Sequence, residues 1–457
     1  MTVMETQTMN QTQIKIPVLL AILASLLFVS APAPAQPPNI LFMVSDDQGW
    51  NDIGYHNDNL RTPNLDQLAE TGVRLEHHYV QPQCTPTRVA LMTGRYPSRF
   101  GPHCTTASND QSYPIGTPTL ASLLKSAGYD TGLFGKWHMG SKPEWGPNHY
   151  GFDFSYGSLA GAVGMYDHRY RLNTPYAQTW HRNHEFIEEV GHATDLVTQE
   201  AVAWIEKDRD KPFFAYVPFH SVHTPLVEEL KWIAMNNHID HPDRRLYAAA
   251  LSHLDWAVGQ LVEAVDRIGQ RENTLIIFTS DNGGMADHYR GGNYPPPDTP
   301  LNKFASNDPL KGWKGQVYEG GMRVPAWVNW KGRLGSGLCD LPMHAVDWLP
   351  TLAPISGYEI DDGMSFDGID VWPLITGEDD NPSERILYWV WGKGRDTERV
   401  ALRKGPWKLL RDGAEGEWEL YNLDSDPNEL MDLAKKRPDL IQSLKFTLEE
   451  EISKDAS

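Results

Sequence analysis

Cysteine is scarce in this sequence, because 457 residues contain only three, Cys84, Cys104 and Cys339. So few cannot staple a chain of this size, which excludes a disulfide-stabilised scaffold. The sequence leaves open whether Cys104 and Cys339 pair with each other, and we expect free thiols. Internal repeats and low-complexity tracts are lacking too, which excludes a repeat architecture.

Positive charge is also in short supply. Lysine and arginine number 40 against 60 aspartates and glutamates, and the formal net charge is −20. Such an acidic chain is not suited to non-specific binding of nucleic acid or anionic lipid, so we expect no nucleic-acid partner. An anionic substrate would need a local cluster of cations that overcomes the unfavourable overall field.

Long apolar runs are missing after the N-terminus. Residues 16–29 form an apolar run that follows Lys15 and ends in Ala33-Pro34-Ala35, a small-x-small sequence. This run is short for a membrane span and is typical of a signal peptide. We therefore predict a signal peptide over residues 1–35, no membrane span, and export to the periplasm or the extracellular space.

What the sequence does contain is an alternation of buried strands with amphipathic helices. The expected strands are 39–45, 130–134, 212–219 and 273–280, and the expected helices are 63–70, 118–127, 193–207 and 246–268. This order predicts an α/β fold in which helices sandwich a large, mainly parallel sheet. We assign it to a catalytic domain over residues 36–356.

The pattern changes after Gly357. Short apolar runs joined by turn residues predict a small antiparallel sheet with strands at 385–390, 399–403, 407–411 and 417–420. A final helix from 438 to 452 packs on it. Residues 357–457 therefore form a predicted C-terminal subdomain.

Oxygen-bearing side chains follow two of the expected strands. Asp46 and Asp47 come after the strand at 39–45, and Asp281 and Asn282 come after the strand at 273–280. Ligands of parallel α/β sheets bind at the carboxyl ends of the strands. Carboxylate and amide oxygens are the ligands that Ca²⁺ or Mg²⁺ prefers. The sequence predicts a hard-cation site at this edge.

A cysteine-containing stretch supplies a candidate nucleophile. Pro86 favours a helix that begins there, with Cys84 just outside its first turn and Arg88 further along the same face. The helix dipole and the guanidinium would lower the pKa of the Cys84 thiol. The alternative is that Cys84 is a small buried hydrophobe.

Further polar groups follow other expected strands. Lys136 and His138 stand two residues apart and would share one side of an extended segment. They could equally be a surface lysine and a capped histidine. His220 and His223 follow the strand at 212–219, where a histidine is well placed to protonate a departing alcohol.

The stretch Cys84-Thr85-Pro86-Thr87-Arg88, followed by Leu91-Met92-Thr93-Gly94-Arg95, resembles the signature of the formylglycine-dependent (type I) sulfatases. Gly135-Lys136-Trp137-His138 resembles a second motif of that family, and Tyr318-Glu319-Gly320-Gly321-Met322-Arg323 a third. The family usually has Ser or Ala where this chain has Thr87, and the Cys-x-Pro-x-Arg core is intact.

The resemblance implies an alkaline-phosphatase-like fold, one Ca²⁺ ion and conversion of Cys84 to formylglycine (3-oxoalanine). A formylglycine-generating or anaerobic maturation enzyme would be a partner. The aldehyde hydrate would attack sulfur, His223 would protonate the leaving alcohol, and His138 would take a proton from the hydrate. The implied metal ligands are Asp46, Asp47, Cys84, Asp281 and Asn282, and the implied sulfate-binding cations are Arg88, Lys136 and Lys314. Family motifs select Lys314 over Lys311, and His223 over His220.

The implied activity is hydrolysis of a sulfuric ester. The segments around Asn51–His56 and Gln81–Pro86 look most similar to the arylsulfatase B (N-acetylgalactosamine-4-sulfatase) branch. With 16 tryptophans, including Trp145, Trp180 and Trp313, this favours a sulfated glycan of galactose or galactosamine type, cleaved at a chain end. Candidate sugar-binding groups are His103, His168, Arg169 and the loop 285–309.

Two other functions remain open at this point. A phosphatase or phosphodiesterase of the same superfamily commonly holds two metals with additional His and Asp ligands, whereas this sequence has Lys136 and Lys314 where extra cation charge is needed. A non-catalytic glycan-binding relative would not need the full set of acids, bases and lysines. Both alternatives are therefore less consistent with the sequence than a sulfatase.

Overall fold

The computed structural model describes residues 1–2, 37–171, 175–285, 304–380 and 384–456. Residues 37–457 form one compact unit, distinct from residues 1–36. The predicted signal peptide lies outside the described residues except for its first two, and so does most of the loop 285–309. Among the helices of the described part, none combines the length and the apolarity needed to cross a bilayer.

A ten-stranded sheet forms the centre of this unit. The strand order is β13-β2-β12-β11-β1-β10-β4-β5-β8-β9. The five central strands run parallel to one another and are β11 (Thr274–Ser280), β1 (Asn39–Ser45), β10 (Phe213–Pro218), β4 (Asp130–Lys136) and β5 (Phe154–Ser158). The outer strands are β13 (Gly337–Cys339), β2 (Val73–Leu75), β12 (Ala326–Asn329), β8 (Trp180–Arg182) and β9 (Glu185–Phe186). The sheet is mixed because antiparallel pairs form on both flanks.

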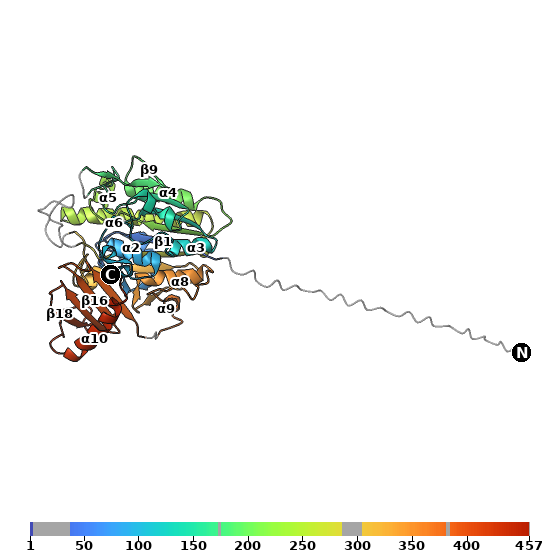
Figure 1. Ribbon diagram of the computed structural model, residues 1–457. Coiled ribbons are helices and arrows are strands. Elements are labelled where there is room, and N and C mark those ends of the chain that lie inside the picture. Colours follow the sequence, from blue (N-terminus) through green and yellow to red (C-terminus); the bar gives the residue numbers. More distant parts are fainter. Residues whose placement is uncertain (3–36, 172–174, 286–303, 381–383, 457) are drawn as a thin grey trace. The chain divides into compact units, whose positions relative to one another are not determined.

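Helices cover both faces of the sheet, as strand β1 makes clear. Its alternate residues fall into two separate cores, with Ile40, Phe42 and Val44 on one face and Leu41 and Met43 on the other. The helices α2 (Cys84–Thr93), α3 (Leu120–Ser126) and α8 (Trp348–Ile355) pack on the first face, and α1 (Pro63–Glu70), α4 (Ala193–Ile205) and α6 (Pro242–Arg267) pack on the second. Figure 1 shows α4 and α6 on the opposite side of β1 from α8. Because both faces are covered, the central strands are continuous apolar runs, and the predicted α/β sandwich is confirmed.

The C-terminal part forms the predicted antiparallel sheet (Figure 1, orange to red). Its strands are β15 (Ile386–Trp391), β16 (Arg399–Lys404), β17 (Trp407–Asp412) and β18 (Trp418–Asn422), and α10 (Pro438–Ile452) follows them. One side of this sheet shares a core with Tyr79, Val317 and Met322 of the larger part. The boundary between residues 356 and 357 stays a prediction, because the two parts pack as one unit.

Several helices begin at other residues than predicted, and α6, expected from 246, already begins at Pro242. The helix expected over 118–127 is α3, which begins at Leu120 because Thr119 caps it by accepting a hydrogen bond from the backbone N–H of Ser122. Helix α8 starts at Trp348. It is preceded by a short 3₁₀ turn, in which the His344 ring accepts a bond from Val346. Residues Cys104 and Cys339 are free and buried, as expected.

A buried ion cluster joins the small sheet to the larger part. Lys408 of β17 lies 2.8 Å from Glu319 and 2.8 Å from Glu429, and all three side chains are fully buried. The Glu429 carboxylate also accepts a hydrogen bond of 2.7 Å from the backbone N–H of Glu319. Burial raises the pKa of Glu429 to about 7. Burial also disfavours the Glu319 carboxylate, yet Lys408 and nearby arginines lower its pKa to about 2.

We predict that Lys408→Gln strongly destabilises the protein, because it leaves two buried carboxylates without their cation. Removing one partner of a buried pair costs about 3–5 kcal/mol, which urea unfolding measures. The control is Lys436→Gln at an exposed position. Equal unfolding midpoints for the two variants would contradict the role of the cluster.

Candidate active site

The site forms at the carboxyl edge of the sheet, where four neighbouring strands end. Strand β1 pairs with β11 so that Ser45 lies opposite Ser280, and with β10 so that Val44 lies opposite Pro218. The residues after these strands therefore meet at one edge. They are Asp46 and Asp47 after β1, Asp281 and Asn282 after β11, and His220 and His223 after β10, while Lys136 ends β4.

The oxygen cluster fits a hard cation. Asp46 Oδ1 and Asn282 Oδ1 are buried and have no hydrogen-bond partner. The Asn282 amide donates to Asp47 Oδ1 at 2.8 Å, which holds its own oxygen away from that carboxylate. Orphaned buried oxygens are rare in folded proteins. Together with the carboxylate of Asp281, they are the donors that Ca²⁺ or Mg²⁺ takes.

Charge crowding at this cluster shifts the pKa of its carboxyl groups. Burial, together with the neighbouring Asp281, raises the pKa of Asp46 to about 8, although Lys136 opposes this. Burial also disfavours ionised Asp47, but Lys314 and His223 hold the pKa of Asp47 well below its usual range. A cation among these carboxylates would relieve their repulsion, so the residues present fit a metal ion.

Cys84 is the first residue of α2, with Gln83 as the cap. The helix therefore begins two residues before the predicted start at Pro86, which lies within the first turn. The thiol is only 2% exposed. Burial raises the pKa of Cys84 despite Lys136 and Lys314, so the predicted lowering is wrong. An unmodified thiol in this position is a poor nucleophile.

Arg88 acts on other protein groups. Its side chain is fully buried and donates to Asp281 Oδ2 at 2.7 and 3.2 Å. It also donates to the carbonyl of Lys136 at 2.7 Å. The guanidinium thus fixes a carboxylate of the oxygen cluster to the end of β4. Its expected contact with a bound anion stays a prediction.

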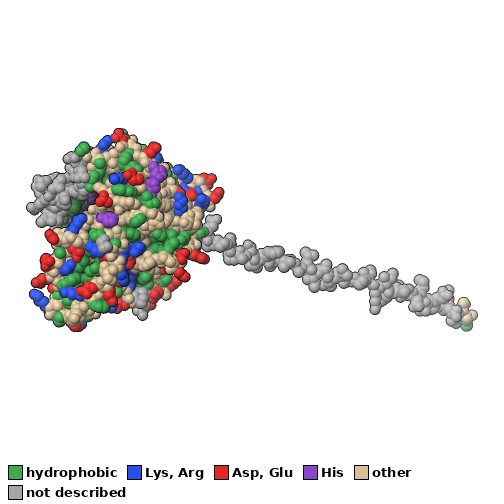
Figure 2. All heavy atoms as spheres, viewed as in Figure 1, with side chains coloured by type: hydrophobic (Ala, Val, Ile, Leu, Met, Phe, Trp, Pro, Cys, Tyr) green, Lys and Arg blue, Asp and Glu red, His purple; other side chains and the backbone are tan. Residues whose placement is uncertain are grey.

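Two lysines face the oxygen cluster, as expected. Lys136 donates to Asp46 Oδ2 at 2.5 Å and is fully buried. Lys314 lies 2.7 Å from Asp47 Oδ1. Lys311 instead donates to Glu419 and Tyr421 of the small sheet. Basic and acidic side chains intermix over the face in Figure 2. Buried Lys136 and partly buried Lys314 supply two cations at the cluster, which an anionic substrate would need.

The two histidines after β10 have different surroundings. His223 Nε2 lies 3.6 Å from Asp47 Oδ2, and the candidate ligand atoms of Asp46, Asp47 and His223 all lie within 4.8 Å of one another. His220 instead bonds Ser158 at 2.7 Å. Burial lowers the pKa of His223 to about 3, although Asp47 opposes this. The structure thus brings His223 to the cluster.

His138 reaches the site in an unexpected way. Strand β4 ends at Lys136, and His138 has a left-handed φ of 54°, so the alternation of a strand does not extend to it. Its Nδ1 is buried without a hydrogen-bond partner. Burial, with Lys136 and Arg88, keeps the pKa of His138 well below its ordinary value. The neutral ring is available to accept a proton.

Sequence reasoning missed two residues here. A Cβ at Gly161 would lie 2.3 Å from the His138 ring, so this glycine makes room for the histidine. Tyr170 is half-buried, and burial raises its pKa, with Asn109 and Lys136 opposing and Cys84 adding to the shift. The phenol is therefore influenced by the charges of Lys136 and Cys84. Neither residue lies in a recognisable motif.

The proposed sugar-binding groups have other partners. The His168 ring bonds the carbonyl of Gly191 at 3.0 Å and lies against Trp180, with ring centres 4.6 Å apart. Arg169 pairs with Glu188 at 2.6 Å. Exposed His103 lies 3.3 Å from the Cys104 sulfur. The cavity beside His168 and Arg169 measures about 150 Å³ and is also lined by Asp167, Glu188 and Glu189. These acids make it unsuited to a sulfate group.

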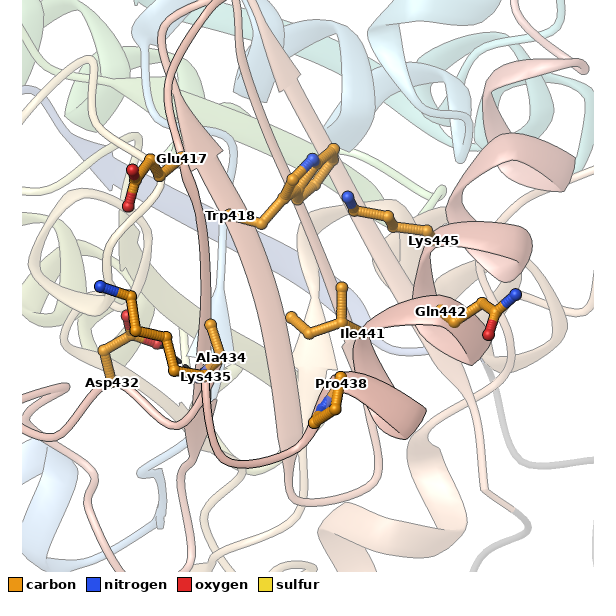
Figure 3. A pocket seen from close by; sticks show the side chains of 9 residues that line it. All are labelled: Glu417, Trp418, Asp432, Ala434, Lys435, Pro438, Ile441, Gln442 and Lys445. Atoms are coloured by element: carbon orange, nitrogen blue, oxygen red, sulfur yellow. Dashed lines mark hydrogen bonds between the residues drawn. The ribbon is translucent and has the colours of Figure 1, made fainter.

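A larger groove lies on the C-terminal part, between β18 and α10 (Figure 3), where Trp418, Ile441 and Pro438 point into it. Arg411 and Lys445 lie over the Trp418 ring, at 5.1 and 4.6 Å from its centre. The groove contains none of the strand-end groups described above. The chemistry therefore belongs to the sheet edge.

The C-terminal antiparallel sheet also contacts the residues next to Cys84, the candidate nucleophile. Trp391 at the end of β15 donates to Gln83 Oε1 at 2.7 Å. The backbone N–H of Gly315 donates to the carbonyl of Pro82 at 2.6 Å, and Arg399 of β16 donates to the carbonyl of Gly315 at 2.8 Å. The residues before Cys84 and after Lys314 are thus fixed to each other and to the C-terminal part.

A family model described as Sulfatase matches residues 38–358. The chain belongs to the sulfatase family. A second model, described as N-sulphoglucosamine sulphohydrolase, C-terminal, matches residues 311–456. The sulfatase-like enzyme class and fold inferred from the motifs are thereby confirmed.

Individual relatives support the assignment. Arylsulfatase J of Mus musculus is 32% identical over 465 residues, covering 90% of this chain and 75% of the relative. N-acetylgalactosamine-6-sulfatase of Mus musculus is 33% identical over 431 residues, covering 89% and 78%. The crystal structure of Ps i-CgsB in complex with k-i-k-neocarrahexaose is 32% identical, covers 92% of this chain and 94% of that one, and has a TM-score of 0.82. This sulfatase is similar to all three.

We predict that Gly161→Ala displaces His138 and lowers turnover of a sulfate ester. Displacement of a catalytic group by about 1 Å can cost about a hundredfold in rate. The control is Gly335→Ala, because a Cβ there meets nothing within 4 Å. Assays of kcat for both variants, with unfolding curves, test this. Wild-type kcat in Gly161→Ala would show that the ring does not need the space.

Proposed function

We propose that this sulfatase removes sulfate from a sulfated carbohydrate, using a formylglycine made from Cys84 and one Ca²⁺ ion. The observation that carries the proposal is a pair of orphaned buried oxygens, Asp46 Oδ1 and Asn282 Oδ1, in a cluster where Lys136 pairs with Asp46 and Lys314 with Asp47. One metal ion and the two lysine ammonium groups suit the single negative charge of a sulfate monoester. A second metal would need ligands where the lysines stand.

The side chains named above would hold each group. Asp46, Asp47, Asp281 and Asn282 are the proposed calcium ligands, together with the modified residue 84. Bound Ca²⁺ would supply charge that polarises anionic oxygens. Formylglycine would supply a hydrated aldehyde as the nucleophile, which an unmodified thiol with a raised pKa does not match.

The remaining residues bind the anion and move protons. Lys136 and Lys314 would neutralise the sulfate oxygens, and Arg88 would hold Asp281 in place. His223 would protonate the departing alcohol, and His138 would accept a proton at the nucleophile. Burial lowers the pKa of both rings, which favours their neutral forms. The negative charge of a bound ester beside His223 would favour its protonated form.

The substrate class rests on similarity. One relative is named as a sulfatase of N-acetylgalactosamine, and one solved structure has a bound carrageenan-type oligosaccharide. We infer a galactose- or galactosamine-type glycan, cleaved at a chain end, with Tyr170 as a sugar-stacking residue. The kinship with the arylsulfatase B branch, the export of the chain and its maturation enzyme stay predictions within this proposal.

We predict that adding Ca²⁺ back to protein freed of metal by exhaustive chelation increases its free energy of unfolding. Binding to the folded state alone adds about 2.7 kcal/mol at a hundredfold excess over Kd, which thermal unfolding detects. Asn282→Ala should lose this response and the activity, whereas Asn59→Ala at an exposed position should keep both. A calcium response that survives Asn282→Ala would place the ion elsewhere.

We predict that active protein carries an aldehyde at position 84. Mass spectrometry of the peptide that contains Cys84 detects it, and Cys84→Ala should lose all turnover. A panel of defined sulfated oligosaccharides then identifies the sugar and the sulfate position. Full activity with an unaltered thiol would overturn the mechanism, and preference for aryl phosphate over aryl sulfate would favour a phosphatase.

A further inference from the structure

The segment Phe219–Glu228, which carries His223, is fixed at both ends. At its start, the backbone N–H of Val222 donates to the carbonyl of Asp46 at 2.9 Å, and Asp46 donates back to Ser221 at 3.0 Å. The hydroxyl groups of Ser221 and Thr194 lie 2.7 Å apart. The first half is thus tied to the oxygen cluster and to the first turn of α4.

The far end is held by two histidines. His192, the cap of α4, donates from Nε2 to the carbonyl of Val227 at 3.0 Å. His253 of α6 donates from Nδ1 to Glu228 Oε2 at 2.8 Å. The side chains of Glu228 and His253 are 1% and 0% exposed. A buried carboxylate therefore anchors the end of the segment.

The surroundings of His253 require a charged ring. Its Nε2 lies 3.2 Å from Asp195 Oδ1, while its Nδ1 meets Glu228. Ionised carboxylates only accept hydrogen bonds, so the ring satisfies both only as an imidazolium. Trp232 of α5 (Leu230–Met235) stacks on it with ring centres 4.7 Å apart and an angle of 18°, which suits a cation.

A metal ion would be the alternative occupant, because candidate ligand atoms of His192, Glu228 and His253 lie within 4.8 Å of one another. The hydrogen bonds argue against it. His192 Nδ1 accepts a bond of 3.2 Å from the backbone N–H of Thr194. The proton of the neutral ring is then on Nε2, where it bonds Val227, and no lone pair of His192 faces the cluster.

We propose that His253 is a positioning residue for catalysis, because its imidazolium clamps Glu228 and thereby holds the segment that places His223 at the leaving group. The proposal rests on the proposed role of His223 in this sulfatase. Loss of the charge at His253 would leave Asp195 and Glu228 facing a neutral ring. The segment would loosen at its far end while Lys136 and Arg88 stay in place.

The same clamp predicts a pH dependence. Burial disfavours the charged ring, but Asp195 and Glu228 raise the pKa of His253 above 6.5. The ion pairing of protonated His253 with Glu228 and Asp195 is therefore fully present below that value. It is lost as the pH rises through the raised pKa. The charged or titratable groups around it are Asp195 of α4, His192 that caps α4, Glu228 of the segment, Lys231 of α5 and Tyr166.

The test compares two leaving groups. Phenyl sulfate needs a proton on its departing oxygen, whereas 4-nitrophenyl sulfate releases a stable anion. We expect His253→Gln to lower kcat for phenyl sulfate by about tenfold or more, since a general acid contributes 10²–10⁴-fold. Turnover of 4-nitrophenyl sulfate and both KM values should change little, and the alkaline decline of kcat should disappear. The control is His184→Gln at an exposed position.

Further measurements guard against a folding defect. Glu228→Gln breaks the same ion pair and should give the same selective loss. Hydrogen–deuterium exchange of residues 219–229 should increase in both variants and not in His184→Gln, whether or not the protein is active. Equal losses on the two esters, unchanged exchange, or zinc bound stoichiometrically and lost in His192→Gln would each overturn the proposal. Wild-type protein inactive on both esters would instead refute the proposed function.

Discussion

Buried negative charge at the carboxyl edge of the sheet is the constraint on which the site depends. Asp46, Asp47 and Asp281 are fully or almost fully buried within one cluster. Carboxylates in such surroundings repel one another, and their loss of hydration costs free energy. Arg88, Lys136 and Lys314 each pair with one of them. The lysines proposed to bind an anionic substrate, Lys136 and Lys314, are thus among the groups that make the cluster stable.

This arrangement explains why the supporting structure is so extensive. Each cation comes from a different element, namely α2, the end of β4 and the segment before α7 (Glu319–Met322). Their positions relative to the carboxylates depend on the register of the parallel strands and on the small sheet, which is bonded to Gln83 and Gly315. The C-terminal part therefore belongs to the catalytic unit in physical terms, whatever boundary the sequence suggests.

Much of the fold and of the site could be predicted from the sequence, because a short stretch of residues shows both a buried strand and the side chains that follow its carboxyl end. The apolar run 39–45 followed by Asp46 and Asp47 specifies both a buried strand and what leaves its end. Family motifs then separated Lys314 from Lys311. Contacts across loops carry no such signal, which is why Gly161 and Tyr170 escaped notice. The predicted lowering of the Cys84 pKa was wrong because a sequence motif shows which charges lie nearby but not how deeply the thiol is buried.

The depth of Cys84 has a consequence for the order of events in the cell. Only 2% of this residue is accessible once the chain has folded, and Gln83 before it is bonded to Trp391, more than 300 residues away in sequence. A modifying enzyme has little access to a side chain that is buried to this extent. If residue 84 becomes an aldehyde, we expect the conversion on the nascent or unfolded polypeptide, before folding restricts the access of a maturation enzyme to this residue.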